Sequence, residues 1–125
     1  MRLMLCVFLG SGLGGVLRYG VSRLIPASAG VFPWATLIVN LVGCFLIGLI
    51  YGAVDSGVLR LDDSTKLFIT TGLCGGLTTF STFTHENYLL FQAHAFGTVA
   101  LYAGISLLAG FICAWLGHAS VGFWR

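Results

Sequence analysis

The chain has 125 residues, of which 58% are hydrophobic and only 8% are charged. Soluble domains carry about 25% charged residues, so this composition excludes a soluble enzyme and a secreted disulfide scaffold. The formal net charge of +2 is not gathered into a basic stripe, which argues against a nucleic-acid-binding module. The sequence therefore predicts a small integral membrane protein.

The ten charged residues divide the chain into neutral runs of 15, 31, 19 and 38 residues. A helix crosses the hydrocarbon core with about 20 mostly apolar residues. The sequence predicts an all-α membrane protein with four transmembrane helices in one domain covering residues 1–125. The expected spans are residues 3–24, 33–54, 65–90 and 97–120.

The loop between the second and third spans is the one clearly aqueous stretch, and Asp63 or Ser64 is expected to cap the helix that follows it. The stretch Ala27-Ser28-Ala29 is similar to a signal-peptidase site. Arg18 and Arg23 lie between the first apolar run and that site, so cleavage is not expected.

An even number of spans places both termini on one side of the membrane. That side has four cations, and the opposite side has at most two. The positive-inside rule favours cytoplasmic termini by this small margin, which permits insertion in both orientations. Because four short helices hardly enclose a pathway, two copies are the more plausible unit. The cations of the two sides are Arg2, Arg60, Lys66 and Arg125, against Arg18 and Arg23.

Small residues recur at four-residue spacing in every span, which is typical of close helix packing in membranes. The four cysteines lie 30 or more residues apart and form no metal-binding or disulfide motif. No Walker-type phosphate loop or nucleophile–base pair is present, so an enzyme is not expected. The packing pairs are Gly10 with Gly14, Gly48 with Gly52, Gly72 with Gly76, and Ser106 with Gly110.

Asn40 lies near the middle of the second span and shares a helical face with Thr36 and Gly43. A buried polar side chain without a partner costs several kcal/mol. One interpretation is that Asn40 cross-links two helices through hydrogen bonds. The other is that its amide donors face a water-filled cavity and hold an anion.

The third span contains the run GLCGGLTTFSTFT from Gly72 to Thr84, which is poorly suited to a continuous helix. We expect the helix to break at Gly75–Gly76. A break frees backbone carbonyls, and carbonyls directed at one point suit a hard cation such as Na⁺. A kinked but continuous helix is the alternative.

Phe80 and Phe83 are three residues apart and project from one helical face. Such pairs usually pack in a core. Here they alternate with the hydroxyls of Ser81, Thr82 and Thr84. Because the edge of an aromatic ring is partly positive, ring edges beside hydroxyl donors can replace part of the hydration shell of a small anion.

Three further polar features belong to the same analysis. Tyr102 and Ser106 form a narrow polar stripe with Gly110 on the fourth span. Glu86 is either a proton carrier or, less specifically, a group that orients nearby hydroxyls. Arg18 either extends to the membrane surface or supplies positive potential at a pore mouth.

These residues together resemble the CrcB/Fluc fluoride channel family over essentially the whole chain. The run GGLTTFSTF from Gly75 to Phe83 is the most specific part of the resemblance. Two shorter blocks, GGVLRY and TLIVNLVG, match less specifically; they begin at Gly14 and Thr36.

The resemblance implies a dual-topology homodimer whose two subunits run antiparallel and form two fluoride pores. It further implies a structural Na⁺ at the dimer centre, held by the backbone carbonyls of Gly75 and Thr78 from each subunit. Some members carry a further serine where this chain has Gly110, so either the polar track is shorter here or water takes the place of that serine. The implied fluoride pathway is Arg18, Thr36, Asn40, Phe80, Ser81, Thr82, Phe83, Glu86, Tyr102 and Ser106.

The function implied by the resemblance is passive export of cytoplasmic fluoride across a bacterial inner membrane. Weakly acidic HF enters the cell and ionises there, and the trapped anion leaves through the channel. The alternatives are a fluoride/proton antiporter and a small dual-topology exporter of cationic drugs, both of which depend on Glu86. A structural membrane subunit would leave the hydroxyl-rich third span unexplained.

Overall fold

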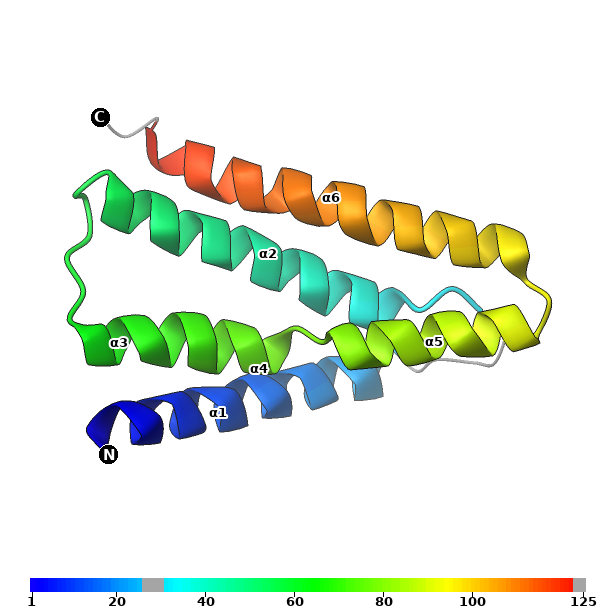
Figure 1. Ribbon diagram of the computed structural model, residues 1–125, viewed down its shortest axis with the longest axis horizontal. Coiled ribbons are helices and arrows are strands. Elements are labelled where there is room, and N and C mark those ends of the chain that lie inside the picture. The colour runs from blue at the N-terminus through cyan, green and yellow to red at the C-terminus, as the bar shows by residue number, and fades with distance from the viewer. Residues whose placement is uncertain (26–30, 123–125) are drawn as a thin grey trace.

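The computed structural model describes residues 1–25 and 31–122, and every regular element in these ranges is helical (Figure 1). The stretch Ala27-Ser28-Ala29 lies outside the described residues. The elements are α1 (Arg2–Leu24), α2 (Trp34–Asp55), α3 (Asp63–Leu67), the π-helix η1 (Phe68–Cys74), α4 (Gly75–Leu77), α5 (Phe80–Gln92) and α6 (Phe96–Gly122).

Three of these helices, α1, α2 and α6, are long and apolar enough to cross a membrane. They have 23, 22 and 27 residues, against the roughly 20 that a span needs. The shorter elements α3, α4 and α5 follow one another along the same long axis (Figure 1). The chain therefore passes four times along this axis, and α6 ends at the end of the molecule where α1 begins.

The third pass differs from the prediction in the position of its interruption. Gly75 is helical (φ −64°, ψ −37°), whereas Thr78 (φ −81°, ψ 157°) and Thr79 (φ −153°, ψ 117°) are extended. The expected break at Gly75–Gly76 is therefore wrong by about three residues. The β-branched threonines leave the helix because extended backbone suits them better, while Gly76 is needed where it lies against α1.

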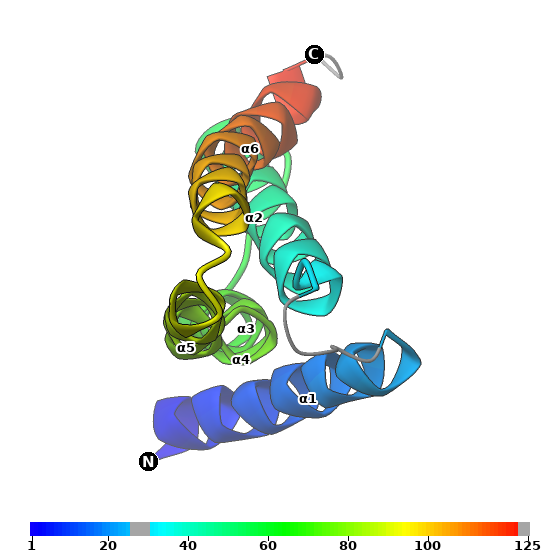
Figure 2. The same cartoon turned by 90° about the vertical axis from the view of Figure 1, so that its right-hand side faces the viewer.

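Helix α1 packs against η1 and α4 through glycines on both sides (Figure 2). A Cβ added at Gly10 would come within 3.0 Å of the Gly72 Cα, and one added at Gly14 would reach the Leu77 nitrogen equally closely. From the other side, a Cβ at Gly76 would come within 3.0 Å of Ser11. Backbone therefore lies directly on backbone in this pair.

Helices α2 and α6 form a second pair that is packed in the same way (Figure 2). A Cβ at Gly48 or Gly52 would collide with the backbone of α6, and one at Gly117 would collide with α2. The predicted Ser106–Gly110 pair does not take part. A Cβ at Gly110 would meet only the Cys44 sulfur, at an ordinary 3.6 Å.

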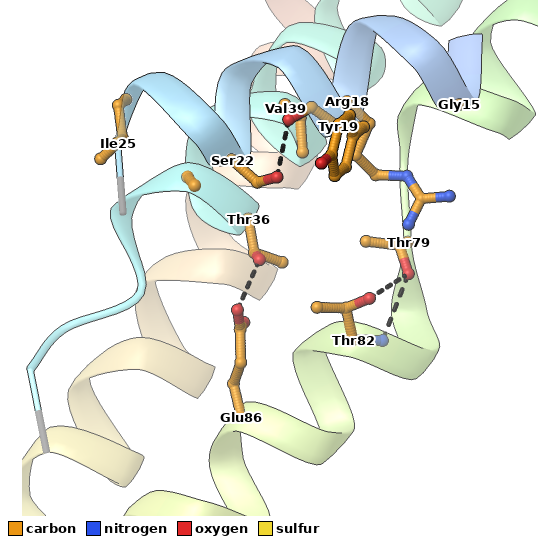
Figure 3. Close-up of a pocket in the computed structure, with 11 residues that line it drawn as sticks. Gly15, Arg18, Tyr19, Ser22, Ile25, Thr36, Val39, Thr79, Thr82 and Glu86 are labelled. Atoms are coloured by element: carbon orange, nitrogen blue, oxygen red, sulfur yellow. Dashed lines mark hydrogen bonds between the residues drawn. The ribbon is translucent and has the colours of Figure 1, made fainter. Parts of the chain in front are cut away.

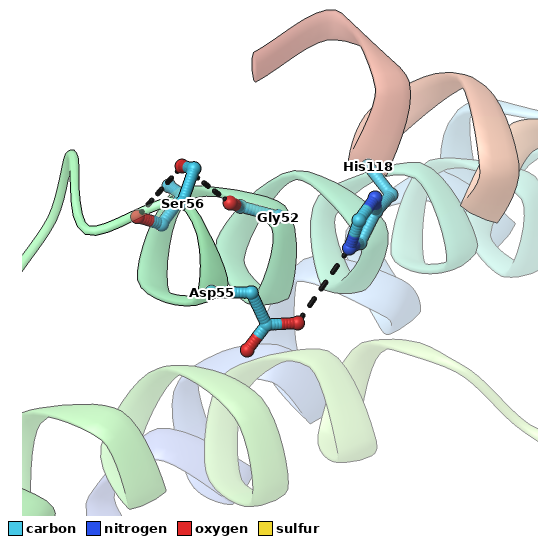
Figure 4. A network of polar contacts seen from close by, with 5 residues as sticks. Gly52, Asp55, Ser56 and His118 are labelled. Carbon is cyan, nitrogen blue, oxygen red and sulfur yellow. Dashed lines mark hydrogen bonds and ion pairs between the residues drawn. The ribbon is translucent and has the colours of Figure 1, made fainter. Parts of the chain in front are cut away.

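The loop between α2 and α3 is held by local polar contacts. Ser56 Oγ donates to the Gly52 carbonyl at 2.7 Å, and Asp55 lies 3.5 Å from His118 at the end of α6 (Figure 4). The cap of α3 is Asp62, not Asp63 or Ser64 as expected. Its carboxylate accepts from the Thr65 hydroxyl at 2.6 Å and from the Ser64 N–H at 3.2 Å, and these bonds lower the pKa of Asp62.

Candidate functional site

The extended residue Thr79 is held by the side chain of Asn40 on α2. Asn40 Oδ1 accepts from the Thr79 N–H at 2.7 Å, and Asn40 Nδ2 donates to the Thr79 carbonyl at 3.2 Å. The amide thus satisfies both backbone groups of one residue that the interruption leaves without helical partners. Of the two interpretations of Asn40, the cross-link between helices is the one visible in these contacts. The second amide N–H is not used by them.

Thr79 also caps α5, a role that the sequence analysis missed. Its Oγ1 accepts from the Thr82 N–H at 3.2 Å and donates to the Thr82 hydroxyl at 3.0 Å, and the Ser81 hydroxyl lies 3.3 Å away. A threonine directly before a helix is a common N-cap. The missed signal was therefore present in the pair Thr78-Thr79.

Two side chains, one from the interruption and one from α1, donate hydrogen bonds to carbonyls near the C-terminal end of α4. The N–H and the hydroxyl of Thr78 both donate to the Cys74 carbonyl at 3.0 Å. Arg18 on α1 donates through Nε to the Gly76 carbonyl at 3.1 Å. Within the described residues, the carbonyls of Gly75, Leu77 and Thr78 accept no hydrogen bond.

Two of these residues, Gly75 and Thr78, line a small cavity of about 210 Å³. Gly75 is exposed at its edge, and Thr78 lies beside it. Oxygen is the ligand type that hard cations prefer, and Gly75 and Thr78 each have a backbone oxygen that accepts no hydrogen bond from the described residues. The other lining residues are Gly43, Cys44, Ile47, Thr70 and Cys74.

Glu86 joins hydroxyls from two other helices. Its two carboxylate oxygens accept from the Thr36 hydroxyl on α2 and from the Tyr102 hydroxyl on α6, each at 2.7 Å. Thr36 is buried, and Tyr102 has no exposed surface. In this structure Glu86 orients nearby hydroxyls, which is the less specific of the two roles considered for it.

A cavity of about 390 Å³ lies between α1, α2 and α5 (Figure 3). It brings together four residues of the predicted pathway, and Arg18 and Glu86 are the two charged side chains in its lining. In Figure 3 the side chain of Arg18 extends from α1 toward Thr79. The lining residues are Gly15, Arg18, Tyr19, Ser22, Ile25, Ala35, Thr36, Val39, Thr79, Thr82 and Glu86.

A second cavity, of about 240 Å³, lies on the other side of the interruption. Here the ring centroids of Phe80 and Phe83 are 5.7 Å apart, and the Phe83 ring is 5.0 Å from that of Tyr102. The Ser106 hydroxyl is buried without a hydrogen-bond partner among the described residues. The lining residues are Asn40, Cys44, Thr78, Thr79, Phe80, Phe83, Ser106 and Leu107.

The predicted site residues therefore fall into three neighbouring groups that meet at Thr78 and Thr79. Tyr102 lines none of the three cavities but reaches the first through Glu86. Ser81 is exposed and contacts the group only through Thr79. What the arrangement offers chemically is a chain of hydroxyl, amide and aromatic-edge donors with one guanidinium and one carboxylate.

Comparison with known proteins identifies relatives across nearly the whole chain. The model of the CrcB-like protein family (Camphor Resistance) matches residues 5–118. A protein of Azobacteroides pseudotrichonymphae is 42% identical over 94% of both chains, and one of Thermus thermophilus is 44% identical over 91% of this chain and 90% of its own. A third, from Methylobacterium sp. strain 4-46, is 46% identical over 85% of both chains. All three are named Fluoride-specific ion channel FluC.

These matches cover the interrupted third pass as well as the three long apolar helices. Channel relatives and apolar helices of this length together indicate a multi-pass membrane protein. The family model extends over more than half of the chain, and each of the three relatives is more than 30% identical to it. The chain belongs to the CrcB-like protein family.

Proposed function

We propose that this chain is a fluoride-selective passive ion channel, not an enzyme, and that it exports cytoplasmic fluoride and so protects the cell from it. The whole chain acts as one four-span domain in the bacterial inner membrane. The relatives named as fluoride channels support this, since they cover 85–94% of the chain and come from bacteria. The observation that carries the proposal is the cavity of about 240 Å³ whose lining includes Asn40, the two phenylalanines Phe80 and Phe83, and Ser106.

Fluoride is small and strongly hydrated, so a pathway has to replace its water with donors that hold it weakly. The unpaired Ser106 hydroxyl and the free Asn40 N–H can each donate to an anion. The rings of Phe80 and Phe83 add partly positive edges without a formal charge. Such donors are favourable enough for entry and weak enough for release.

The larger cavity supplies the next part of the pathway. Arg18 gives it positive potential. The Thr82 hydroxyl accepts from Thr79 and keeps its own proton for an anion, whereas the hydroxyl protons of Thr36 and Tyr102 are donated to Glu86. Ser81 extends this track toward the surface from Thr79. Because Glu86 accepts from two hydroxyls, those hydroxyls keep fixed orientations while an anion passes.

The functional unit in this proposal is an antiparallel homodimer. Gly75 and Phe80 are exposed, Phe80 to 76%, and the neighbouring carbonyls of Gly75, Leu77 and Thr78 accept no hydrogen bond from the described residues. At membrane depth, unpaired carbonyls need partners from protein or an ion. A second copy covers this face, and the small charge bias of the loops permits the opposite orientation that such a dimer requires.

A structural Na⁺ at the centre of this dimer fits the residues present. The carbonyls of Gly75 and Thr78 accept no hydrogen bond from the described residues, and both residues line the cavity of about 210 Å³. Two copies would supply four such oxygens. The cation would neutralise the converging carbonyl dipoles and hold the two interrupted segments together.

The decisive experiment is fluoride efflux from liposomes that contain the purified protein, recorded with a fluoride electrode. We expect rapid efflux that requires a counter-ion path for charge, persists without a pH gradient and carries little chloride. Efflux that stops when the proton gradient is collapsed would establish the antiporter instead. Efflux of a cationic dye with no fluoride flux would favour the drug exporter.

Substitution of the rings tests the pathway itself. Phe80→Ile and Phe83→Ile remove the ring edges but keep a large apolar side chain, and each should lower fluoride flux about tenfold or more. Phe91→Ile is the matched control, because Phe91 is exposed on the same helix and lines none of the three cavities. Unchanged flux in both pathway variants would refute the role of the aromatic edges.

A further inference from the structure

The interrupted segment receives a side-chain hydrogen bond from α1 that crosses 58 positions of sequence. Arg18 Nε donates to the Gly76 carbonyl at 3.1 Å. Gly76 is also the residue whose Cα faces the backbone of Ser11, so α1 contacts this peptide both by packing and by a hydrogen bond. The carbonyls of Gly75 and Thr78, on either side in sequence, remain free of protein donors within the described residues.

We propose that Arg18 is a positioning residue for the cation site, in addition to its place beside the anion cavity. By fixing the Gly76 peptide, Arg18 sets the direction of the last turn of α4 and hence the direction in which the Gly75 and Thr78 carbonyls point. This inference rests on the Na⁺ site of the proposed function and goes beyond it. It assigns control of that site to a side chain that does not coordinate the ion.

The physical basis is the geometry of a short helix end. Helix α4 is the last turn of a helical run from Asp63 to Leu77, and the last carbonyls of a helix have no partners within it. A guanidinium hydrogen bond to a carbonyl is charge-assisted, and such bonds are stronger than those between neutral groups. Ion sites are sensitive to ligand direction, so losing this bond should weaken Na⁺ binding.

A purely electrostatic role makes the opposite prediction. Arg18 carries a positive charge close to the proposed cation, and that charge alone repels Na⁺. If charge dominated, removing it would tighten Na⁺ binding. Arg18→Lys keeps the charge but loses the planar Nε donor, and Arg18→Gln removes the charge, so the two variants together separate position from charge.

The experiment measures how Na⁺ raises the Tm of the purified protein in detergent, with N-methylglucamine as the replacement cation. The midpoint is the Na⁺ concentration that gives half of the full rise in Tm. This readout needs no fluoride flux, so it is independent of whether the wild type conducts fluoride. For Arg18→Lys we expect a midpoint about tenfold higher than that of the wild type, which corresponds to about 1.4 kcal/mol. The matched control is Arg23→Lys, because Arg23 is exposed on the last turn of the same helix and its side chain makes no hydrogen bond or ion pair with the part of the chain that the structure describes.

An unchanged midpoint in Arg18→Lys with a lower midpoint in Arg18→Gln would overturn the positioning role in favour of simple repulsion. A shift of equal size in Arg23→Lys would overturn it as well, because the effect would then be general to α1. If Arg18→Lys does not yield folded protein, a raised midpoint in Arg18→Gln supports the proposal and an unchanged or lowered one refutes it. A wild type that conducts fluoride but is not stabilised by Na⁺ would remove the cation site and leave the channel in place.

Discussion

Two regions of the third pass are held in different ways, although they are adjacent in sequence. The part from Phe68 to Leu77 lies against α1 with glycines on both sides, so its position is set by backbone packing. The part from Thr78 to Thr82 is held by side chains, with Asn40 on the backbone of Thr79 and Thr79 on Thr82.

The difference separates what builds the molecule from what makes its site. Glycine packing brings two backbones into direct contact and allows little adjustment, which suits a scaffold within lipid. The side-chain contacts hold extended backbone at membrane depth, where its polar groups would otherwise lack partners. Substitutions in the first region should therefore destabilise the protein through steric collision, and substitutions in the second through loss of hydrogen bonds.

The largest effect is expected in the packed region. Gly14→Ala places a Cβ within 3.0 Å of the backbone of α4, and backbone cannot move aside as a flexible side chain can. We expect the free energy of unfolding to fall by more than about 2 kcal/mol. The fraction of monodisperse protein in size-exclusion chromatography should fall with it.

Gly20→Ala provides the contrast on the same helix. A Cβ at Gly20 meets nothing within 4 Å, so the alanine should stabilise α1 by up to about 1 kcal/mol through its higher helix propensity. Equal destabilisation by the two variants would show that close packing does not decide their effects, and the comparison between the regions would lose its basis.

A smaller effect is expected in the hydrogen-bonded region. Asn40→Ala leaves the N–H and the carbonyl of Thr79 without their partner, at a cost of about 1–3 kcal/mol in unfolding free energy. Fluoride flux should fall more than about tenfold, because the segment between the two cavities is no longer fixed. Unfolding in detergent and efflux from liposomes measure the two effects separately.

Asn87→Ala is the matched control for this loss. Asn87 Nδ2 donates to the Phe83 carbonyl of its own helix at 2.9 Å, and Asn87 lines none of the three cavities. Its removal should leave flux within about twofold of the wild type. If Asn40→Ala were as mild as Asn87→Ala, the bond to Thr79 would be incidental to the site.

The same contrast explains how much could be predicted from the sequence. The spacing of the charged residues is enough to find the three long apolar helices. Charged side chains are rare within the hydrocarbon core, so they mark the ends of the apolar runs that span it. The predicted interruption at Gly75–Gly76 is wrong because the prediction depended on the low helix propensity of glycine. Both stay helical, and Gly76 lies directly on the backbone of α1, a contact that is not visible in local sequence.

The site could be predicted in its residue types more readily than in its contacts. Glu86 could be singled out as an acid within a neutral stretch, but its two hydroxyl partners come from positions 50 and 16 residues away. The bond from Arg18 to Gly76 spans 58 positions and follows from the way α1 crosses α4. Thr79 is the exception, because its capping role was readable in the sequence directly before α5.

The smallest effect is expected at Asp62. It tests whether exposure to water weakens a hydrogen bond from a backbone N–H to a side-chain oxygen. Asp62 accepts a backbone N–H from Ser64 just as Asn40 accepts one from Thr79, but Asp62 is exposed in the aqueous loop. Bulk water competes for the Asp62 bond, whereas Asn40 is half-buried on a helix that is long and apolar enough to cross a membrane. Asp62→Ala should therefore lower Tm by only about 1–3 °C. Asp63→Ala should lower it less, because the Asp63 side chain makes no hydrogen bond to residues 1–25 or 31–122.

The Tm difference between the wild type and Asp62→Ala should depend on pH. The bonds from Thr65 and Ser64 lower the pKa of Asp62 in the folded chain below that in the unfolded chain, which is about 3.9. Their contribution is therefore complete above about pH 5 and is lost as the pH falls through the folded pKa. The Tm difference between the wild type and Asp62→Ala should shrink below about pH 4, whereas that between the wild type and Asn40→Ala should not change, since an amide does not titrate. A difference for Asp62 that stayed constant down to about pH 3 would mean that the loop bond is independent of charge, and the contrast with the membrane-embedded amide would then rest on burial alone.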